Sequence, residues 1–345
     1  MPTTITAVQN ALVDQSTADI IGEPCWFPLR YDVGNDAFVF GWIPPETLRA
    51  LTFIADFQPA QVQSIPRKAI EDVQAAAPMH IVLHSGLGGS TLLSRALAQP
   101  GVVTTLKEPP ILTDVVAFGL QSSSEEMSRL LDEVAQLLSR PFAPEESLVC
   151  KMSSVGNGLG ADIAEMQPDT RILCLQTPLD RFLASLASKG EQGRAGARRL
   201  FVGLQNSRIS CVTIAEAELG DYPDLALAAL AWLSIQKLMI DAGQRLGAER
   251  VRSLGSETLL TDPGTSLQAV ADHFGLGLDV EARIEAGVFD RHAKTGQSFD
   301  EAQRMVSFQQ TLAAHGAEIE ETIEWAHKVA QAQQIAWDLP YPLFD

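Results

Sequence analysis

The stretch HIVLHSGLGGSTLLSRAL, residues 80–97, decides the fold of this chain. Its first five residues form a mainly apolar run, which predicts a buried strand that ends at His84. A glycine-rich turn follows over residues 85–89, and Ser90 and Thr91 then begin an apolar helix. Backbone N–H groups and the helix dipole at such a junction bind phosphate or sulfate. The stretch therefore predicts an anion-binding loop, and a turn that serves only close packing is the alternative.

Short apolar runs and helical patterns alternate from residue 79 onward. The predicted strands cover residues 80–84, 102–106, 147–151, 171–176 and 250–254. The predicted helices between them cover residues 90–99, 124–139, 157–166, 178–189 and 223–246. This alternation is typical of a parallel sheet that carries helices on both faces. We predict an α/β fold with a P-loop-type parallel sheet flanked by helices, followed by a helical C-terminal part with a long helix over about residues 299–334.

The first 78 residues differ in character from the rest of the chain. Residues 25–43 read as two β runs around the turn Gly34-Asn35-Asp36, and Pro44-Pro45-Glu46 begins a short helix. Residues 58–78 contain three prolines and resemble a loop. We predict a small β-rich N-terminal extension, residues 1–78, that packs on a domain of residues 79–345. An independent module is the alternative.

The charge balance excludes two classes of partner. The chain has 43 acidic and 25 basic residues and a net charge of −18. A general nucleic-acid binder or a protein that docks on anionic lipid needs a basic surface, so we expect neither partner. An anionic ligand would have to be met by a local group of positive residues. In this setting the basic run Lys189, Arg194, Arg198 and Arg199 is unexpected, and either a bound anion or a solvated helix face explains it.

The remaining composition points to a cytoplasmic protein without a metal. The most apolar stretch, residues 225–240, contains Ser234, Gln236 and Lys237, which predicts a buried helix and not a membrane span. The N-terminus lacks the pattern of a secretory signal. The four cysteines lie far apart with no metal-ligand spacing, so we expect free thiols in a reducing cytoplasm and no bound metal.

The loop after the first strand differs from the Walker A loop of ATPases and kinases. That loop needs a lysine before the hydroxyl residue, to reach the β- and γ-phosphates. Here Gly89 precedes Ser90, and no lysine lies in the turn. The common ATP-dependent enzymes of the P-loop class are therefore disfavoured.

The run Gly89-Ser90-Thr91-Leu92-Leu93 resembles the second half of the phosphosulfate loop of the sulfotransferase superfamily, in a divergent, bacterial form. Members share the P-loop architecture and bind 3′-phosphoadenosine 5′-phosphosulfate (PAPS). The resemblance implies that the 5′-phosphosulfate is bound by the loop residues Gly86, Gly88, Gly89, Ser90 and Thr91. It departs from the family at Leu87 and Gly88, where relatives have Lys or Arg and then Ser.

The resemblance continues at the ends of the next two strands. Lys107-Glu108 is similar to a Lys-Glu pair of the family, in which the glutamate is the general base for the acceptor. Lys151 is similar to the lysine of a Lys-x-His element, although Lys151-Met152-Ser153 lacks the histidine. The resemblance thus implies Lys107 and Lys151 as cations that stabilise the leaving phosphate, and Glu108 as the base. A surface lysine and an ordinary ion-pair carboxylate are the alternatives.

Two further segments resemble those with which the family binds the 3′-phosphate. In the first, Gln176 replaces the usual Arg and Ala184 the usual Ser, so Ser185 is the candidate hydroxyl. The second is the segment HAKTG, residues 292–296, which implies Lys294 as a phosphate contact. A mainly structural segment of the family resembles residues 257–263. Weaker candidates for contact with the ligands are His84, Arg194 and His292.

Three functions follow from these patterns. The first is a sulfotransferase that moves a sulfuryl group from PAPS to a hydroxyl or amine of a small-molecule or carbohydrate acceptor. The second is a nucleotide-dependent phosphotransferase of the P-loop fold. The third is a non-catalytic nucleotide-binding module that kept the fold. The sequence does not identify the acceptor or the oligomeric state.

Overall fold

The computed structural model describes residues 16–70, 73, 77–290 and 301–344. Its centre is a five-stranded parallel sheet in the order β5-β6-β4-β7-β8. The strands are β4 (Met79–His84), β5 (Val103–Lys107), β6 (Ser147–Lys151), β7 (Ile172–Gln176) and β8 (Val251–Gly255). All five predicted strands are present within about two residues of their expected bounds, and the α/β fold class is confirmed.

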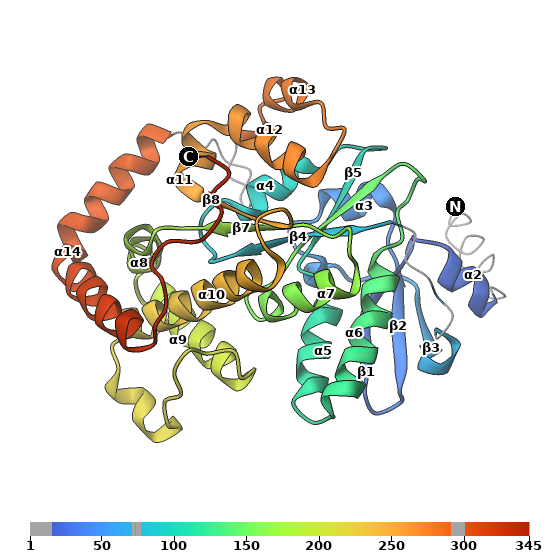
Figure 1. Ribbon diagram of the computed structural model, residues 1–345, viewed down its shortest axis with the longest axis horizontal. Coiled ribbons are helices and arrows are strands. Elements are labelled where there is room, and N and C mark those ends of the chain that lie inside the picture. The colour runs from blue at the N-terminus through green and yellow to red at the C-terminus, as the bar shows by residue number, and fades with distance from the viewer. Residues whose placement is uncertain (1–15, 71–72, 74–76, 291–300, 345) are drawn as a thin grey trace, which may run out of the picture.

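Helices cover both faces of this sheet (Figure 1). One face carries α5 (Pro110–Gly119), α6 (Ser124–Leu138), α7 (Gly160–Met166) and α10 (Asp224–Leu246). The other carries α4 (Ser90–Leu97) and α12 (Pro263–Phe274), with α11 (Ser256–Thr261) and α13 (Val280–Glu285) beside them. In β4, Ile81 and Leu83 belong to the first core and Val82 to the second, because successive side chains of a strand point to opposite faces. This explains why the strand is a continuous apolar run.

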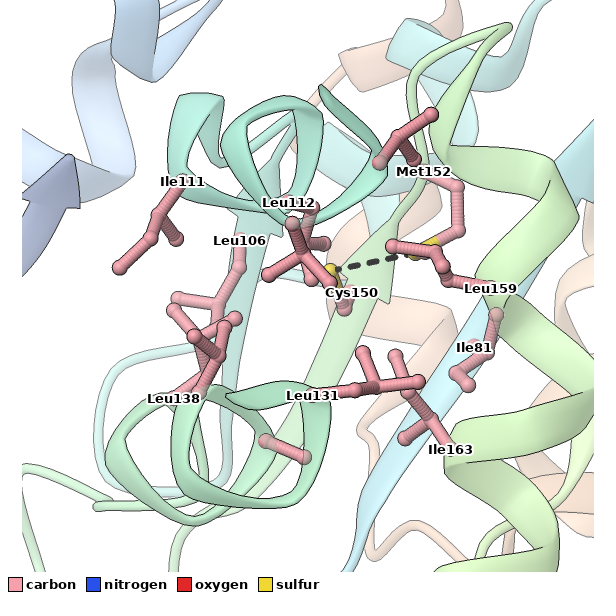
Figure 2. Packing of buried hydrophobic residues seen from close by; sticks show 14 of the residues in the cluster. Ile81, Leu106, Ile111, Leu112, Leu131, Leu138, Cys150, Met152, Leu159 and Ile163 are labelled. Carbon is pink, nitrogen blue, oxygen red and sulfur yellow. Dashed lines mark hydrogen bonds between the residues drawn. The ribbon is translucent and has the colours of Figure 1, made fainter. Parts of the chain in front are cut away.

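Figure 2 shows how the first of these cores is packed. Leu106 of β5 and Cys150 of β6 lie between α5, which carries Leu112, and α6, which carries Leu131 and Leu138. The Sγ atom of Cys150 lies 3.7 Å from the Sδ atom of Met152, and the four cysteines are free thiols. Burial raises the pKa of the Cys150 thiol to about 12, so this thiol is a packing group.

The N-terminal part forms an antiparallel sheet of β1 (Trp26–Asp32), β2 (Ala37–Trp42) and β3 (Val62–Pro66), with α2 (Thr17–Gly22) and α3 (Pro45–Ala50). The prediction of a loop over residues 58–78 is wrong for β3, which pairs Ile65 with Phe38. Only one residue of this strand is buried, so it has almost no hydrophobic pattern. Residues of this sheet and of the main sheet belong to one hydrophobic core.

A third helical layer lies beside the sheet and consists of α8 (Leu179–Ala187), α9 (Gly190–Asn206) and α14 (Glu301–Ala332). The predicted helix ranges did not include α2, α5 or α9, although a helix face was one explanation of the basic run over residues 189–199. Of the described helices, α10 alone is long and apolar enough to span a membrane, but 78% of its most apolar window is buried inside the molecule, as predicted. Short 3₁₀ turns complete the described chain at Ile54–Asp56, Arg67–Ala69, Gly156–Leu159, Glu216–Asp221 and Val288–Asp290.

Candidate functional site

A cavity of about 880 Å³ opens at the carboxyl end of the parallel sheet, where ligands of open α/β folds bind. The turn after the central strand β4 forms its floor, and residues that follow β5, β6, β7 and β8 form its walls. The predicted site residues that line it are His84, Gly86, Gly88, Gly89, Ser90, Thr91, Glu108, Lys151 and Ser185. The cavity thus brings together most of the candidates from four separate parts of the sequence.

The turn after β4 is fixed by backbone geometry and by Thr177. Gly86 and Gly89 have φ angles of 88° and 84°, and Leu87 has a φ of 57°. The Thr177 N–H donates to Ser85 Oγ at 2.7 Å, and the Thr177 hydroxyl donates to the Gly86 carbonyl at 2.8 Å. These contacts hold the turn open in front of the first turn of α4.

Gly88 is required by close approach and not by its φ angle. A Cβ at this position would lie 1.9 Å from Thr177 Oγ1 and 2.8 Å from Ser256 Cβ. Gly89 is the N-cap of α4 and has no side chain that could occupy the first N–H groups of the helix. Ser90 and Thr91 follow it, both buried and both on the cavity wall. The floor therefore offers backbone N–H groups and two hydroxyls, which are donors suited to a tetrahedral anion.

Lys151 and Glu108 form a partly buried ion pair in the cavity. The Lys151 ammonium donates to Glu108 Oε1, and the Glu108 N–H donates to the Lys151 carbonyl at 2.9 Å. The Lys151 side chain is 1% exposed, whereas the Glu108 side chain is 26% exposed. The ring centroid of Phe53 lies 5.0 Å from Lys151 Nζ. The carboxylate therefore faces the cavity, and the ammonium lies behind it under an aromatic ring.

The structure gives Lys107 a different place from the one expected. Its ammonium donates to the carbonyls of Arg49 at 2.8 Å and Leu48 at 3.4 Å, at the end of α3. The side chain is fully buried and is not part of the cavity lining. Burial, followed by the charges of Arg95 and Lys151, lowers the pKa of Lys107 to about 8. Direct contact with a ligand in the cavity is therefore not available to it.

A cluster that the sequence did not reveal lies on the β7–β8 side of the cavity. Glu257 Oε1 accepts from Arg304 Nη1 at 3.0 Å, and Glu257 Oε2 lies 3.5 Å from Arg181 Nε. The guanidinium carbon of Arg181 lies 3.6 Å from the ring centroid of Phe308. Arg181 lies five residues after Gln176, the position at which the family that the sequence resembles has an Arg. This nearness in the sequence is what could have indicated Arg181 as a phosphate contact. Arg304 and Phe308 come from α14, which only the tertiary fold brings to the cavity.

Other candidates lie elsewhere in the molecule. Arg194 forms two hydrogen bonds of 2.7 Å with Glu318, and Arg198 binds Asp224 and two backbone carbonyls. These arginines of the basic run are thus structural ion-pair partners of α14 and α10, while Lys189 lines the cavity at the start of α9. His292 and Lys294 lie outside the described residues. Within the described ranges no group of three or more His, Cys, Asp or Glu could hold a metal ion.

The comparisons with known proteins found solved structures that are similar to this chain. No protein-family model and no curated protein matches it. A sulfotransferase domain from the Synechococcus PCC 7002 olefin synthase is similar at 20% identity, with a TM-score of 0.42, over 78% of this chain and 98% of that chain. Sulfotransferase STF9 from Mycobacterium avium is similar at 14% identity, with a TM-score of 0.44, over 78% and 81% of the two chains.

A third similar structure is the sulfotransferase domain from the curacin biosynthetic pathway. It is 15% identical, with a TM-score of 0.39, over 64% of this chain and 79% of that chain. All three of these structures are sulfotransferases.

Proposed function

We propose that the protein is a sulfotransferase that moves a sulfuryl group from PAPS to a hydroxyl or amine acceptor. The observation that carries this proposal is that two groups of residues line the same cavity. One is the anion-binding turn over residues 85–91, and the other is the Lys151–Glu108 pair at the ends of the neighbouring strands. A phosphosulfate on the turn would lie beside a cation and a carboxylate, the two groups that sulfuryl transfer needs.

The described residues fit the two anionic ends of PAPS. The turn offers N–H groups and the hydroxyls of Ser90 and Thr91, and its close approach at Gly88 leaves no room for any side chain there. The 3′-phosphate requires separate cations, and Arg181 and Arg304 line the same cavity on the β7–β8 side, with Ser185 nearby in α8. Lys294 stays a prediction for this end of the cofactor.

PAPS, when bound, supplies a sulfuryl group: the acceptor oxygen bonds to sulfur, the bond from sulfur to the bridging oxygen breaks, and the desulfonated product PAP leaves with that electron pair. Glu108 is the carboxylate that takes the acceptor's proton, since it faces the cavity. Lys151 stabilises negative charge from its buried place beside the turn.

Binding and transfer measurements test this proposal together. We expect PAP to raise the melting temperature more than ATP does, because the turn lacks the lysine that serves the β- and γ-phosphates. We expect labelled PAPS to give a sulfated product, and Glu108→Gln to lower the transfer rate by about 10²- to 10⁴-fold while PAP affinity is retained.

The outcomes separate the rival functions. Stabilisation by ATP or GTP without stabilisation by PAP would overturn the proposal in favour of a phosphotransferase. PAP binding with no transfer to any acceptor would instead indicate a non-catalytic binding module.

The expected partners and location are part of the same proposal. A small-molecule or carbohydrate acceptor, no nucleic acid and no membrane agree with the net charge of −18. The free thiols of the four cysteines agree with a cytoplasmic protein.

A further inference from the structure

The anion-binding turn is held by Thr177, the second residue before α8. The Thr177 N–H donates to Ser85 Oγ at 2.7 Å, and the Thr177 hydroxyl donates to the Gly86 carbonyl at 2.8 Å. The remaining polar group of Thr177 is its backbone carbonyl, which accepts from the indole N–H of Trp232 at 2.8 Å. All three polar groups of Thr177 are therefore used, two of them by the turn and one by α10.

Trp232 lies in the middle of α10 and is not part of the cavity lining. Its side chain is 1% exposed and packs in the same core as Phe182 of α8. The ring fills the core, but the buried indole N–H needs an acceptor. That acceptor is the carbonyl of the residue that holds the turn. A core tryptophan is thus joined to the anion-binding turn through Thr177 alone.

Gln176, the last residue of β7, is joined to the same helix. Its Nε2 atom donates to Gln236 Oε1 at 2.7 Å, and Gln236 lies one helical turn after Trp232. Gln236 is 1% exposed, so its amide group also needs hydrogen-bond partners. Its Nε2 atom donates to the Trp337 carbonyl at 2.7 Å. Two consecutive residues at the end of β7 are therefore tied to α10 and, through it, to the residues after α14.

The C-terminal segment, residues 335–344, runs back from the end of α14 to the edge strand β8 (Figure 1). The backbone of Ser253 in β8 forms two hydrogen bonds with this segment, of 2.9 and 2.8 Å. In its middle, the ring centroid of Trp337 lies 5.3 Å from that of Trp232. The segment is thus anchored on the sheet and covers the tryptophan that binds Thr177.

We propose that Trp232 is a positioning residue for the anion-binding turn, and that the C-terminal segment holds Trp232 in place. This proposal rests on anion binding by the turn, which is part of the proposed function. A turn whose donors are already oriented binds an anion without the cost of ordering it. Packed side chains and hydrogen bonds carry such coupling, and the coupling is reciprocal. An anion on the turn therefore stabilises the docked C-terminal segment in return.

Replacing Trp232 tests the hydrogen bond to Thr177. Trp232→Phe removes the indole N–H and keeps an aromatic ring, and we expect the Kd for PAP to rise about tenfold. Trp26→Phe is the matched control, because Trp26 is also 1% exposed but lies in β1, outside the cavity lining. Calorimetry measures the affinities, and urea unfolding measures the stability lost in each variant. An unchanged Kd in Trp232→Phe, or an equal rise in both variants, would overturn the positioning role.

Replacing Trp337 tests the C-terminal segment. Trp337→Ala uncovers the ring of Trp232, whereas Trp337→Phe keeps an aromatic contact, and both keep the backbone carbonyl that Gln236 binds. We expect PAP affinity to fall by about threefold or more in Trp337→Ala and to be restored in Trp337→Phe. Full PAP affinity in Trp337→Ala, or the same loss in both variants, would contradict the role of this segment.

Hydrogen exchange tests the reciprocal effect without turnover. The Leu343 N–H donates to the Ser253 carbonyl, and neither residue lines the cavity. PAP should slow exchange in the C-terminal segment of the unaltered protein by about threefold or more, and this slowing should disappear in Trp232→Phe. If PAP leaves the exchange of this segment unchanged, the coupling does not exist.

Inorganic sulfate separates this proposal from the proposed function, because it needs the turn and no nucleotide site. Sodium sulfate is titrated against sodium chloride at equal ionic strength, and the rise in melting temperature should be smaller in Trp232→Phe than in Trp26→Phe. That result without any PAP binding would support the positioning role and contradict the sulfotransferase. Equal PAP binding by Trp232→Phe and the unaltered protein would overturn the positioning role and leave the sulfotransferase standing.

Discussion

At the scale of single residues, the cavity depends on backbone conformations that side chains disfavour. Leu87 and Glu108 have φ angles of 57° and 56°, in the left-handed region that costs a residue with a side chain about 1–2 kcal/mol. Both residues line the cavity. Strain of this kind persists where the surrounding structure holds it, as Thr177 and Lys151 do here.

The clearest residue-scale prediction concerns Gly88. In Gly88→Ala the new methyl group would collide with Thr177 Oγ1, so the turn or Thr177 must move. We expect the free energy of unfolding to fall by about 1–3 kcal/mol and PAP affinity to fall in parallel. Urea unfolding and calorimetry measure the two effects.

Gly316→Ala is the control for this change. Gly316 lies in the interior of α14 with nothing within 4 Å, so alanine should raise the free energy of unfolding by about 0.5–1 kcal/mol. A Gly88→Ala variant with unaltered stability and PAP affinity would show that the close approach at Thr177 has no role.

At the scale of elements, three helices from distant parts of the chain bring charge to the β7–β8 side. Arg181 belongs to α8, Glu257 to α11 and Arg304 to α14. Glu257 pairs with both arginines, so a phosphate bound there must compete with this carboxylate. The affinity of the site for an anion is therefore set by how strongly Glu257 holds the two guanidinium groups.

Replacing Glu257 tests this competition. In Glu257→Gln we expect PAP affinity to rise, by about threefold to tenfold, because the competing charge is gone. AMP, which lacks the 3′-phosphate, is the control ligand and should bind with unchanged affinity. Calorimetry with both ligands measures the difference, and a weaker PAP complex in Glu257→Gln would mean that Glu257 positions the arginines instead of competing for them.

The elements also show what the sequence could predict. Strands β4, β5, β6 and β7 were visible because each is a short run of mostly buried residues. The edge strand β8 is less clear, because it contains the partly exposed Arg252 and ends on an exposed glycine. Helix α9 was missed because it contains several glycines and arginines, and its folding depends on tertiary contacts. A Cβ at Gly193 would lie 2.0 Å from the Leu186 carbonyl of α8, and Arg194 pairs with Glu318 of α14. Neither contact can be read from a local pattern.

The residues of the candidate site also fall into two groups, those that the sequence could predict and those that only the tertiary fold brings to the cavity. The turn, Glu108 and Lys151 follow strands that the sequence predicts, so their convergence at one edge of the sheet could be foreseen. Phe53 and Arg304 reach the cavity from the N-terminal part and from α14. Their contribution depends on packing between parts of the chain that share no local signal.

At the scale of the whole molecule, the excess of acidic over basic residues means that few cations are available for binding a ligand. Many arginines are used in ion pairs between elements, such as Arg67 with Glu133 and Arg245 with Asp162 and Glu165. Arg30 binds both carboxylate oxygens of Asp114 at 2.8 Å and so ties β1 to α5. These arginines are committed to contacts between elements, while the cavity keeps its own small group of basic residues.

The junction between the N-terminal part and the main sheet contains a charge with no carboxylate partner in the contacts described. Lys107 is fully buried and donates to the carbonyls of Leu48 and Arg49. Its pKa is lowered from the ordinary value of 10.5 to about 8, first by burial and then by Arg95 and Lys151. Lys107 therefore couples the packing of the two parts to pH.

The lowered pKa of Lys107 makes the stability of the folded protein depend on pH. Between pH 8 and 10.5 the unfolded chain keeps the Lys107 proton that the folded protein has lost, so the folded state gains stability as pH rises. The free energy of unfolding of the unaltered protein should therefore rise relative to that of Lys107→Met across this window, with a slope of at most about 1.4 kcal/mol per pH unit. Below pH 8 the difference should be constant. Urea unfolding of both proteins from pH 7 to 10.5 measures it, and a difference that stays flat or falls would mean that Lys107 remains charged throughout.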